Sequence, residues 1–313
     1  MKTQVIDEKP DPNLLDGLEV DAQAAPSLNP FDWKLPEVDW EEVARRARER
    51  HIAAMAPFAD PATGAFIGTS LGAWLVEAQH AGIPYIGAEL LLGISRDLFM
   101  REEETAKTHQ ALWADFYGKQ KSVPEGFMVR WDACAGLDLK FAMANREGYG
   151  EHARIVHPSD PRACDINYEY PSDTLKMWKR PWVPALMMNG YPVELRVFIE
   201  NGQVLGVANY YPQHTLPDTE QIQGFVTAAK AAAETLVASL QARGRHPWMV
   251  NYAARYAEGS INATLDFLIT EDEEVVFLEA GPPFSMGAHP CSFQDQEIKG
   301  IALGLAPGVQ PRG

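Results

Sequence analysis

The sequence predicts a mixed α+β fold, because strand-like hairpins and long helical segments follow one another irregularly along its 313 residues. Residues 191–213 and 263–284 each have two apolar runs separated by a short polar turn, which is typical of a β-hairpin. Between them, residues 219–243 form an Ala-rich amphipathic segment that predicts a helix ending near Gly244. This order of elements favours α+β over a doubly wound parallel sheet.

The chain divides by composition into four predicted regions. Residues 1–36 are rich in Pro, Asp and Asn and predict an extended arm. Residues 37–119 are mainly helical in pattern, with one helix beginning at Trp40, short helices joined by turns over 63–100, and a longer helix over 95–117. The character changes near Pro124, so we expect a strand-rich region over 120–295 and a tail over 296–313.

Charge and cysteine content narrow the class of protein. A formal net charge of -16 argues against binding nucleic acid or an anionic membrane through bulk electrostatics, although it allows a local basic pocket. The three cysteines lie far apart without CxxC spacing, which indicates neither a disulfide framework nor a zinc site. The first residues lack the pattern of a signal peptide, and the apolar runs are too short for a membrane span. We therefore expect a cytoplasmic protein.

The first hairpin carries two charges inside its strands. Asn201-Gly202 is a strong signal for a two-residue turn, because both residues tolerate positive φ. Counting outward from this turn places Glu194 opposite Asn209, and strand alternation puts Glu194 and Arg196 on one face. One interpretation is a cross-strand ion pair or hydrogen bond on a solvated face; the other is a functional site.

The second hairpin brings two acids together. A turn centred on Asp272 and Glu273 places Asp266 opposite Glu279. Two facing carboxylates repel each other by a few tenths to ~1 kcal/mol, and a cation between them would relieve this. Oxygen ligands of this kind suit Mg²⁺. The alternative is two exposed acids on an outer face of an acidic protein.

Taken together, these motifs resemble those of the ATP-grasp superfamily. The motifs are two basic residues flanking a turn, an E-x-R hairpin followed by Asn-Tyr, a strand Asp, and an E-x-x-P that closes a second hairpin. They stand here as Arg130 and Lys140, Glu194-Leu195-Arg196, Asn209-Tyr210, Asp266, and Leu278-Glu279-Ala280-Gly281-Pro282. The resemblance covers about residues 120–295. It is strongest to the clade that includes phage proteins and the cell-division-cycle chaperone that assembles a translation initiation factor.

The resemblance implies a cleft between two α+β subdomains that binds ATP and Mg²⁺. It implies an ATP-dependent ligase that activates a carboxylate as an acyl-phosphate for an amine or other nucleophile, with an unknown small molecule or protein as acceptor. The residue roles it implies are metal ligation by Asp266 and Glu279, catalysis by Arg196 and Glu194, and nucleotide binding by Arg130, Lys140, Arg180, Trp182, Val183 and Asn209.

One position departs from the family pattern. Gly281 stands where the family has an asparagine, so a ligand for metal or phosphate is missing. Water or a neighbouring side chain would have to substitute, or catalysis would be weakened or lost. The alternative function is therefore an ATP-binding assembly or chaperone-like protein, or a phage structural protein, without turnover.

Overall fold

The computed structural model describes residues 39–95, 110–157, 160, 174–211, 216–249 and 256–283, together with 293–294, 297–298 and 302–305. The arm predicted over 1–36 lies outside these residues. Of the tail predicted over 296–313, only 297–298 and 302–305 are described.

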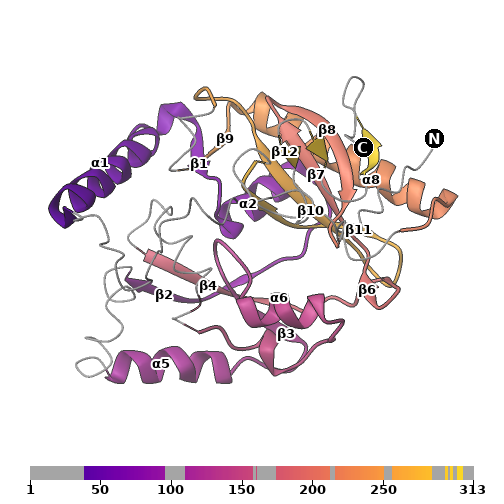
Figure 1. Cartoon of the computed structure of the whole chain (residues 1–313), viewed down its shortest axis with the longest axis horizontal. Helices are drawn as coiled ribbons and strands as arrows, with labels where there is room; N and C mark the ends of the chain where they lie inside the picture. Colours follow the sequence, from indigo (N-terminus) through magenta and orange to yellow (C-terminus); the bar gives the residue numbers. More distant parts are fainter. Residues whose placement is uncertain are drawn as a thin grey trace, which may run out of the picture.

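The centre of the fold is a five-stranded antiparallel sheet with the strand order β11-β10-β7-β8-β14. Two helices, α2 and α8, lie against one side of this sheet (Figure 1). The elements are β7 (Glu194–Glu200), β8 (Gln203–Asn209), β10 (Ala263–Ile269), β11 (Val275–Gly281), β14 (Ala302–Leu305), α2 (Leu71–Ala81) and α8 (Glu220–Ala242).

The side chains of strand β7 point alternately to the apolar and the polar face of the large sheet. Leu195, Val197 and Ile199 point into the main hydrophobic core, where they pack with apolar residues of α2 and α8. Because side chains alternate along a strand, Glu194 and Arg196 point to the opposite face. Both are nevertheless buried, so the second face of the sheet is also covered.

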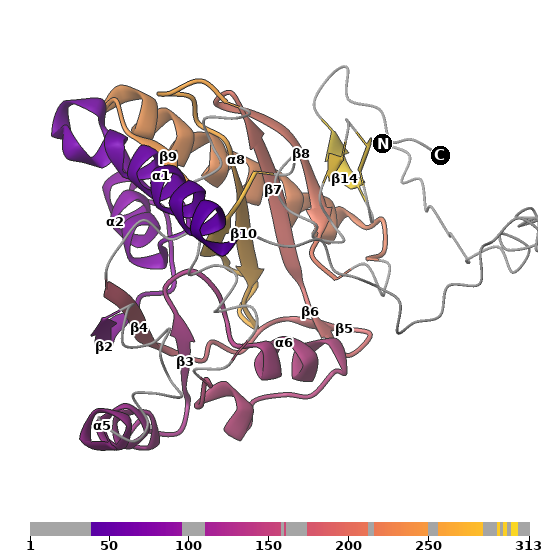
Figure 2. The ribbon, with the colours of Figure 1, turned by 60° about the vertical axis from the view of Figure 1, so that its left-hand side comes forward.

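A second, smaller sheet lies beside the start of α2 and away from α8 (Figure 2). Its antiparallel strands have the order β2-β4-β3, and α5 packs against them through Phe116, whose ring stacks on that of Trp131 with centroids 5.9 Å apart. The elements are β2 (Glu89–Ser95), β3 (Phe127–Trp131), β4 (Thr174–Pro181), α5 (Gln110–Lys121) and α6 (Leu137–Ala144).

The remaining elements are short, apart from α1. They are α1 (Trp40–Ala59), η1 (Pro61–Thr63), β1 (Ala65–Ile67), η2 (Glu151–Ala153), β5 (Met187–Met188), β6 (Tyr191–Pro192), β9 (His246–Trp248), β12 (Phe293–Gln294) and β13 (Glu297–Ile298). The side chain of Asp39 caps α1 by accepting a hydrogen bond from the Glu42 amide. None of the helices described is long and apolar enough to cross a membrane.

The structure confirms the predicted α+β class and the helices that begin at residue 40 and span 220–242. Of the short helices expected over 63–100, one forms as α2, whereas strands β1 and β2 lie on either side of it where further helices were expected. Those strands pair with β9 and β4, far away in the sequence, and local pattern cannot show such pairing. Of the helix expected over 95–117, only the part from residue 110 is described, as α5. The predicted region boundaries stay a prediction.

Both hairpins form, each with a bulge. Asn201 and Gly202 make the predicted turn with φ of 49° and 72°. The expected pairing of Glu194 with Asn209 is wrong: Leu205 is an extra residue in β8, so Leu195 pairs with Asn209. In the second hairpin Asp266 does face Glu279.

A tight junction fixes α2 to the smaller sheet. Asp132 Oδ1 accepts hydrogen bonds from the Gly72 amide at 3.0 Å and from the Trp178 indole N–H at 2.6 Å. The indole lies so close to Gly72 that a Cβ there would come within 2.5 Å of a ring carbon. The junction therefore requires glycine at the start of α2.

Gly72→Ala should lower the free energy of unfolding by about 1–3 kcal/mol, because the added methyl group displaces the Trp178 ring. Gly224→Ala is the control, since this exposed position in α8 has open space around it, and the change should raise stability by roughly 0.5–1 kcal/mol. Urea unfolding of both variants measures the difference. Equal changes in the free energy of unfolding at the two positions would contradict the close contact between Gly72 and Trp178.

Candidate functional site

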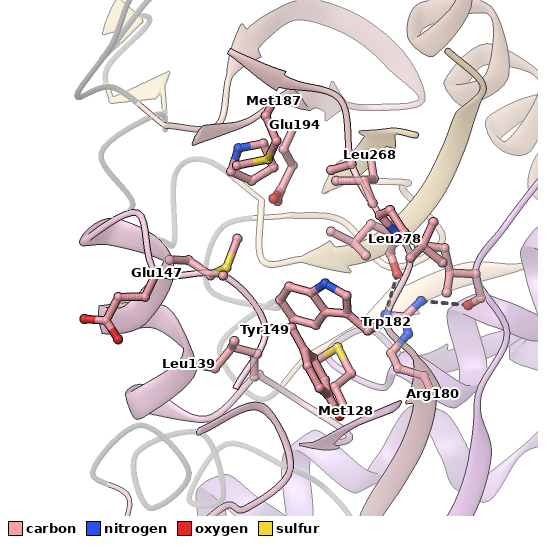
Figure 3. A pocket seen from close by; sticks show the side chains of 18 of the residues that line it. Met128, Leu139, Glu147, Tyr149, Arg180, Trp182, Met187, Glu194, Leu268 and Leu278 are labelled. Carbon is pink, nitrogen blue, oxygen red and sulfur yellow. Dashed lines mark hydrogen bonds between the residues drawn. The ribbon is translucent and has the colours of Figure 1, made fainter. Parts of the chain in front are cut away.

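A cavity of about 360 Å³ lies between the smaller sheet and the polar face of the large sheet. This volume falls within the usual range for ligand pockets, about 300–1,000 Å³. Figure 3 shows its lining: Trp182 and Tyr149 stand together, Glu194 points into the space from β7, and Glu147 points away. The lining is apolar at one end and charged at the other.

The apolar end is built around the segment that follows β4. The Trp182 ring packs against Tyr149, with centroids 5.4 Å apart, and against Met128 and Leu139. The Trp182 amide is held by the Gly126 carbonyl at 2.8 Å. In the part of the chain that the structure describes, the backbone N–H and C=O of Val183 have no hydrogen-bond partner. Val183 lines the cavity, so its backbone N–H and C=O can form hydrogen bonds with a flat polar ligand.

The charged end joins the two sheets. Arg130 on β3 donates a hydrogen bond from Nη1 to Glu279 on β11, and Lys140 on α6 lies with its Nζ 3.8 Å from Glu279 Oε1. Burial opposes the ionisation of Glu279, but the charges of Arg130 and Lys140 outweigh it and hold the pKa of this carboxyl well below its usual range. Glu279 is thus a carboxylate at neutral pH.

The charges of the first hairpin form a buried ion pair. Arg196 donates from Nε and Nη2 to the two oxygens of Asp266, at 2.7 and 2.6 Å, and its side chain is 8% exposed against 0% for Asp266. The pair is buried, so the interpretation that placed an ion pair on a solvated face is wrong about the environment. Arg196 does have an acid as its cross-strand partner, as an ion pair requires. Both residues lie beneath the cavity rather than in its lining.

Tyr210, at the end of β8, connects the two charged clusters. Its ring lies 4.7 Å from the Arg196 guanidinium, and its hydroxyl accepts a hydrogen bond from Lys140 Nζ at 2.5 Å. Aromatic residues on strands are usually packed in the core, and Tyr210 is buried in a cluster with Tyr191 and Tyr211. The neighbouring basic residues come from distant segments, so no local signal identifies this contact.

Glu194 is a buried acid that lines the cavity. Its burial, together with the nearby charge of Asp266, raises its pKa to about 8, although Lys140 and Arg196 act in the opposite direction. The Tyr211 hydroxyl hydrogen-bonds with it. Near neutral pH the Glu194 carboxyl therefore carries a proton and can donate a hydrogen bond into the cavity.

Arg180 ties the smaller sheet to the large one. Its Nη1 donates to the Leu278 carbonyl at 3.0 Å and its Nη2 to the Ile86 carbonyl at 2.7 Å. Leu278 is the bulged residue of β11, which leaves its carbonyl outside the regular ladder. The Arg180 Nε has no partner within the described residues, and the residue lines the cavity. Arg180 is thus a clamp between the two sheets.

Asn209 and Gly281 also lie away from the cavity lining. The Asn209 amide nitrogen donates to the Tyr211 carbonyl at 2.7 Å, so this side chain shapes the end of β8. At Gly281, an added Cβ would stand 3.0 Å from the Thr264 hydroxyl, which itself donates to the Pro282 carbonyl. Thr264 thus limits the room for a longer side chain at position 281. The binding role of Asn209 stays a prediction.

The carboxylate oxygens of Asp266 and Glu279 are of the chemical type that Mg²⁺ prefers as ligands. Asp266 and Glu279 face each other across β10 and β11, and Mg²⁺ commonly takes one or two carboxylates and completes its shell with water and phosphate. In this structure the charge of each acid is balanced by a basic side chain of the chain itself. No cluster of three or more metal-binding side chains occurs among the described residues. Metal ligation by these acids stays a prediction.

Removing one member of the Arg196–Asp266 pair should cost about 3–5 kcal/mol of stability, because the other charge is left buried and unpaired. Arg196→Met and Asp266→Leu are the single changes, and the double variant should recover most of the loss. Urea unfolding of all four proteins provides the cycle. A single-variant cost below about 1 kcal/mol would indicate a solvent-exposed pair.

The raised pKa of Glu194 predicts a pH dependence of stability. The folded state holds a proton on Glu194 that the unfolded state releases, so stability falls as the pH rises from about 4.5 to about 8. Glu194→Gln has no such proton to lose, and its stability relative to wild type should increase across this window. An exposed acid changed in the same way, Glu151→Gln, is the control. Parallel stability profiles for wild type and Glu194→Gln would contradict the assignment.

No family model matches the chain, and no curated protein matches it. Among solved structures it is similar to N5-carboxyaminoimidazole synthase from Aspergillus clavatus in complex with ADP (10% identity, 68% of this chain and 44% of that chain, TM-score 0.33). It is also similar to the D-alanine-D-alanine ligase from Coxiella burnetii (12%, 69% and 47%, 0.31) and to Cdc123 from Schizosaccharomyces pombe (10%, 68% and 82%, 0.42). The chain thus spans less than half the length of these two enzymes. These neighbours include a ligase and Cdc123, and the chain itself has a mixed α+β fold built from helices and antiparallel sheets.

Proposed function

We propose that the cavity binds Mg-ATP and that the protein is an ATP-dependent ligase of the ATP-grasp type. The observation that carries this proposal is the two-ended lining: an apolar slot with a free backbone edge at Val183, and a cationic end at Arg130 and Lys140. A nucleotide has the same polarity, since a flat base is joined to a polyanion. The reaction would activate a carboxylate as an acyl-phosphate for attack by an amine or other nucleophile.

Each part of the lining has a role in this proposal. Trp182 and Tyr149 would flank the base, and the Val183 backbone would read its polar edge. Arg130 and Lys140 would bind the phosphates, because charge-assisted hydrogen bonds to anionic oxygens are about twice as strong as neutral ones. Bound Mg²⁺ would neutralise phosphate charge beside Asp266 and Glu279.

The chemistry left to the protein is positioning and charge neutralisation, because phosphoryl transfer requires little covalent participation. Arg196 would neutralise charge that develops on the transferred group, since Tyr210 connects it to Lys140 at the charged end of the cavity. Glu194, protonated and pointing into the cavity, would donate a hydrogen bond to an anionic oxygen of nucleotide or substrate. Tyr210 would hold Lys140 and Arg196 apart at a fixed distance.

A second candidate is an ATP-binding assembly or chaperone-like protein without turnover, or a phage structural protein. The observation that favours it is the engagement of both acids by arginines, together with the absence of a side-chain ligand at Gly281. Binding of ATP is common to the ligase and the chaperone-like protein, whereas ADP release in the presence of an acceptor belongs to the ligase alone.

Mg-ATP should raise the melting temperature by several degrees. At 100 times the Kd, a ligand that binds only the native state adds about 2.7 kcal/mol of stability. The shift should decrease from ATP to ADP to AMP, because the phosphates bind at Arg130 and Lys140. Thermal-shift measurements with a non-hydrolysable ATP analogue separate binding from turnover.

Lys140→Met should lose most of this shift, whereas Lys230→Met should keep it. Lys230 is an exposed lysine on α8 that pairs with Glu234 and is absent from the cavity lining, so it controls for the loss of one positive charge. Absence of a shift with any nucleotide in the wild-type protein would sink the nucleotide proposal. An equal loss in both variants would mean that the effect is general electrostatics.

A further inference from the structure

We infer that this site binds a metal ion and a polyphosphate only together. Ion pairs within the site already engage the carboxylates that a metal ion alone would need and the basic side chains that a polyphosphate alone would need. This inference rests on the proposed nucleotide site and concerns its selectivity. It assigns Arg130, Glu279, Arg196 and Asp266 a shared role as an ion-pair lock, the name used below for these four residues.

The first half of the lock spans the two sheets. Glu279 accepts a hydrogen bond from Arg130, whose side chain is only 4% exposed, and lies 3.8 Å from Lys140. These are the two cations that a phosphate group would contact. An incoming anion must therefore displace the Glu279 carboxylate, which leaves that carboxylate buried without its counter-charge. Such an uncompensated charge is costly, so a metal-free polyphosphate binds poorly.

The second half lies one strand further into the sheet. Asp266 is completely buried and receives two hydrogen bonds from Arg196. A metal ion that reached Asp266 and Glu279 by itself would need to compete with two arginines that cannot lose their protons. A free divalent cation therefore binds poorly as well.

Both costs disappear when the two ligands arrive together. Phosphate oxygens replace Glu279 at Arg130, and the released carboxylate meets the metal that the phosphates bring. Each buried charge then keeps a partner throughout the exchange. By linkage, metal and nucleotide must strengthen each other's binding by the same factor, which for coupled sites is typically about 5–150-fold.

Calorimetric titration and thermal shift of the full chain test the lock with four additions: Mg²⁺ alone, ATP with chelator, Mg²⁺ with ATP, and Mg²⁺ with inorganic triphosphate. The wild-type protein should respond to the two mixtures and hardly at all to Mg²⁺ or ATP alone. A wild-type response to Mg²⁺ alone, or an ATP affinity that does not change on chelation, would overturn the inference while leaving the nucleotide site standing.

Two variants should change the selectivity in opposite directions. Glu279→Gln releases Arg130 and Lys140, so ATP should bind without metal, and the ratio of affinities with and without Mg²⁺ should fall toward one. Arg130→Gln releases Glu279, so the site should gain a measurable affinity for Mg²⁺ alone. If neither variant gains the predicted binding, the ion pairs do not control access and the inference fails.

Glu77→Gln is the matched control. Glu77 on α2 is a buried acid that accepts hydrogen bonds from Arg243 and Arg245, and it does not line the cavity. Its loss should weaken folding as an ion-pair deletion does, without changing the dependence of ATP binding on metal. No response to any addition in the wild-type protein would instead contradict the proposed function itself.

Discussion

The ion pair between Arg196 and Asp266 is the constraint on which the arrangement of this protein depends. It sits on adjacent central strands with both partners buried, so the polar face of the large sheet must be covered as the apolar face is. A slip of one residue between β7 and β10 would turn one of the two charges into the hydrophobic core and leave the other without its partner, so such a register is excluded energetically. A buried ion pair is weak evidence for stability by itself, but here it specifies which residues face the smaller sheet. Glu194, two residues earlier, is thereby aimed into the cavity.

Two β-bulges adjust this frame to the site. The extra residue Leu278 in β11 offers its carbonyl to Arg180 of the smaller sheet, while the pairing of Asp266 with Glu279 is kept just beyond it. The extra residue Leu205 shifts the end of β8. In its final position Tyr210 lies against both Arg196 and Lys140. Bulges re-aim side chains where a regular ladder would not bring them together, and in this fold they lie on both strands that flank the central ion pair.

The sequence predicts those features of the fold that depend on residues close together in the chain. The turn at Asn201-Gly202 follows from backbone sterics. Asp266 does face Glu279 as the count predicts, but Ile269 pairs with Val275, one residue off that count, and the bulge at Leu278 restores the pairing. The bulges have no comparable signal, and they explain why Glu194 does not face Asn209. The ion-pair partners of the charged residues cannot be predicted from the sequence either, because Arg130 and Glu279 are 149 positions apart and meet only when the two sheets pack. Sequence reasoning therefore predicts which residues carry charge into the site, whereas which charge neutralises which is a property of the tertiary structure.

This distinction changes how the two acids are understood. Taken as a hairpin alone, Asp266 and Glu279 repel each other and invite a metal ion. In the folded chain each faces an arginine, so the repulsion is already relieved and a metal must enter by exchange rather than by simple attraction. Desolvation makes the exchange selective: a buried charge that loses one partner must gain another at the same time. Under the proposed ion-pair lock, the site has little affinity for either ion alone, and its specificity for the complex of the two follows from the charges that the fold has already paired.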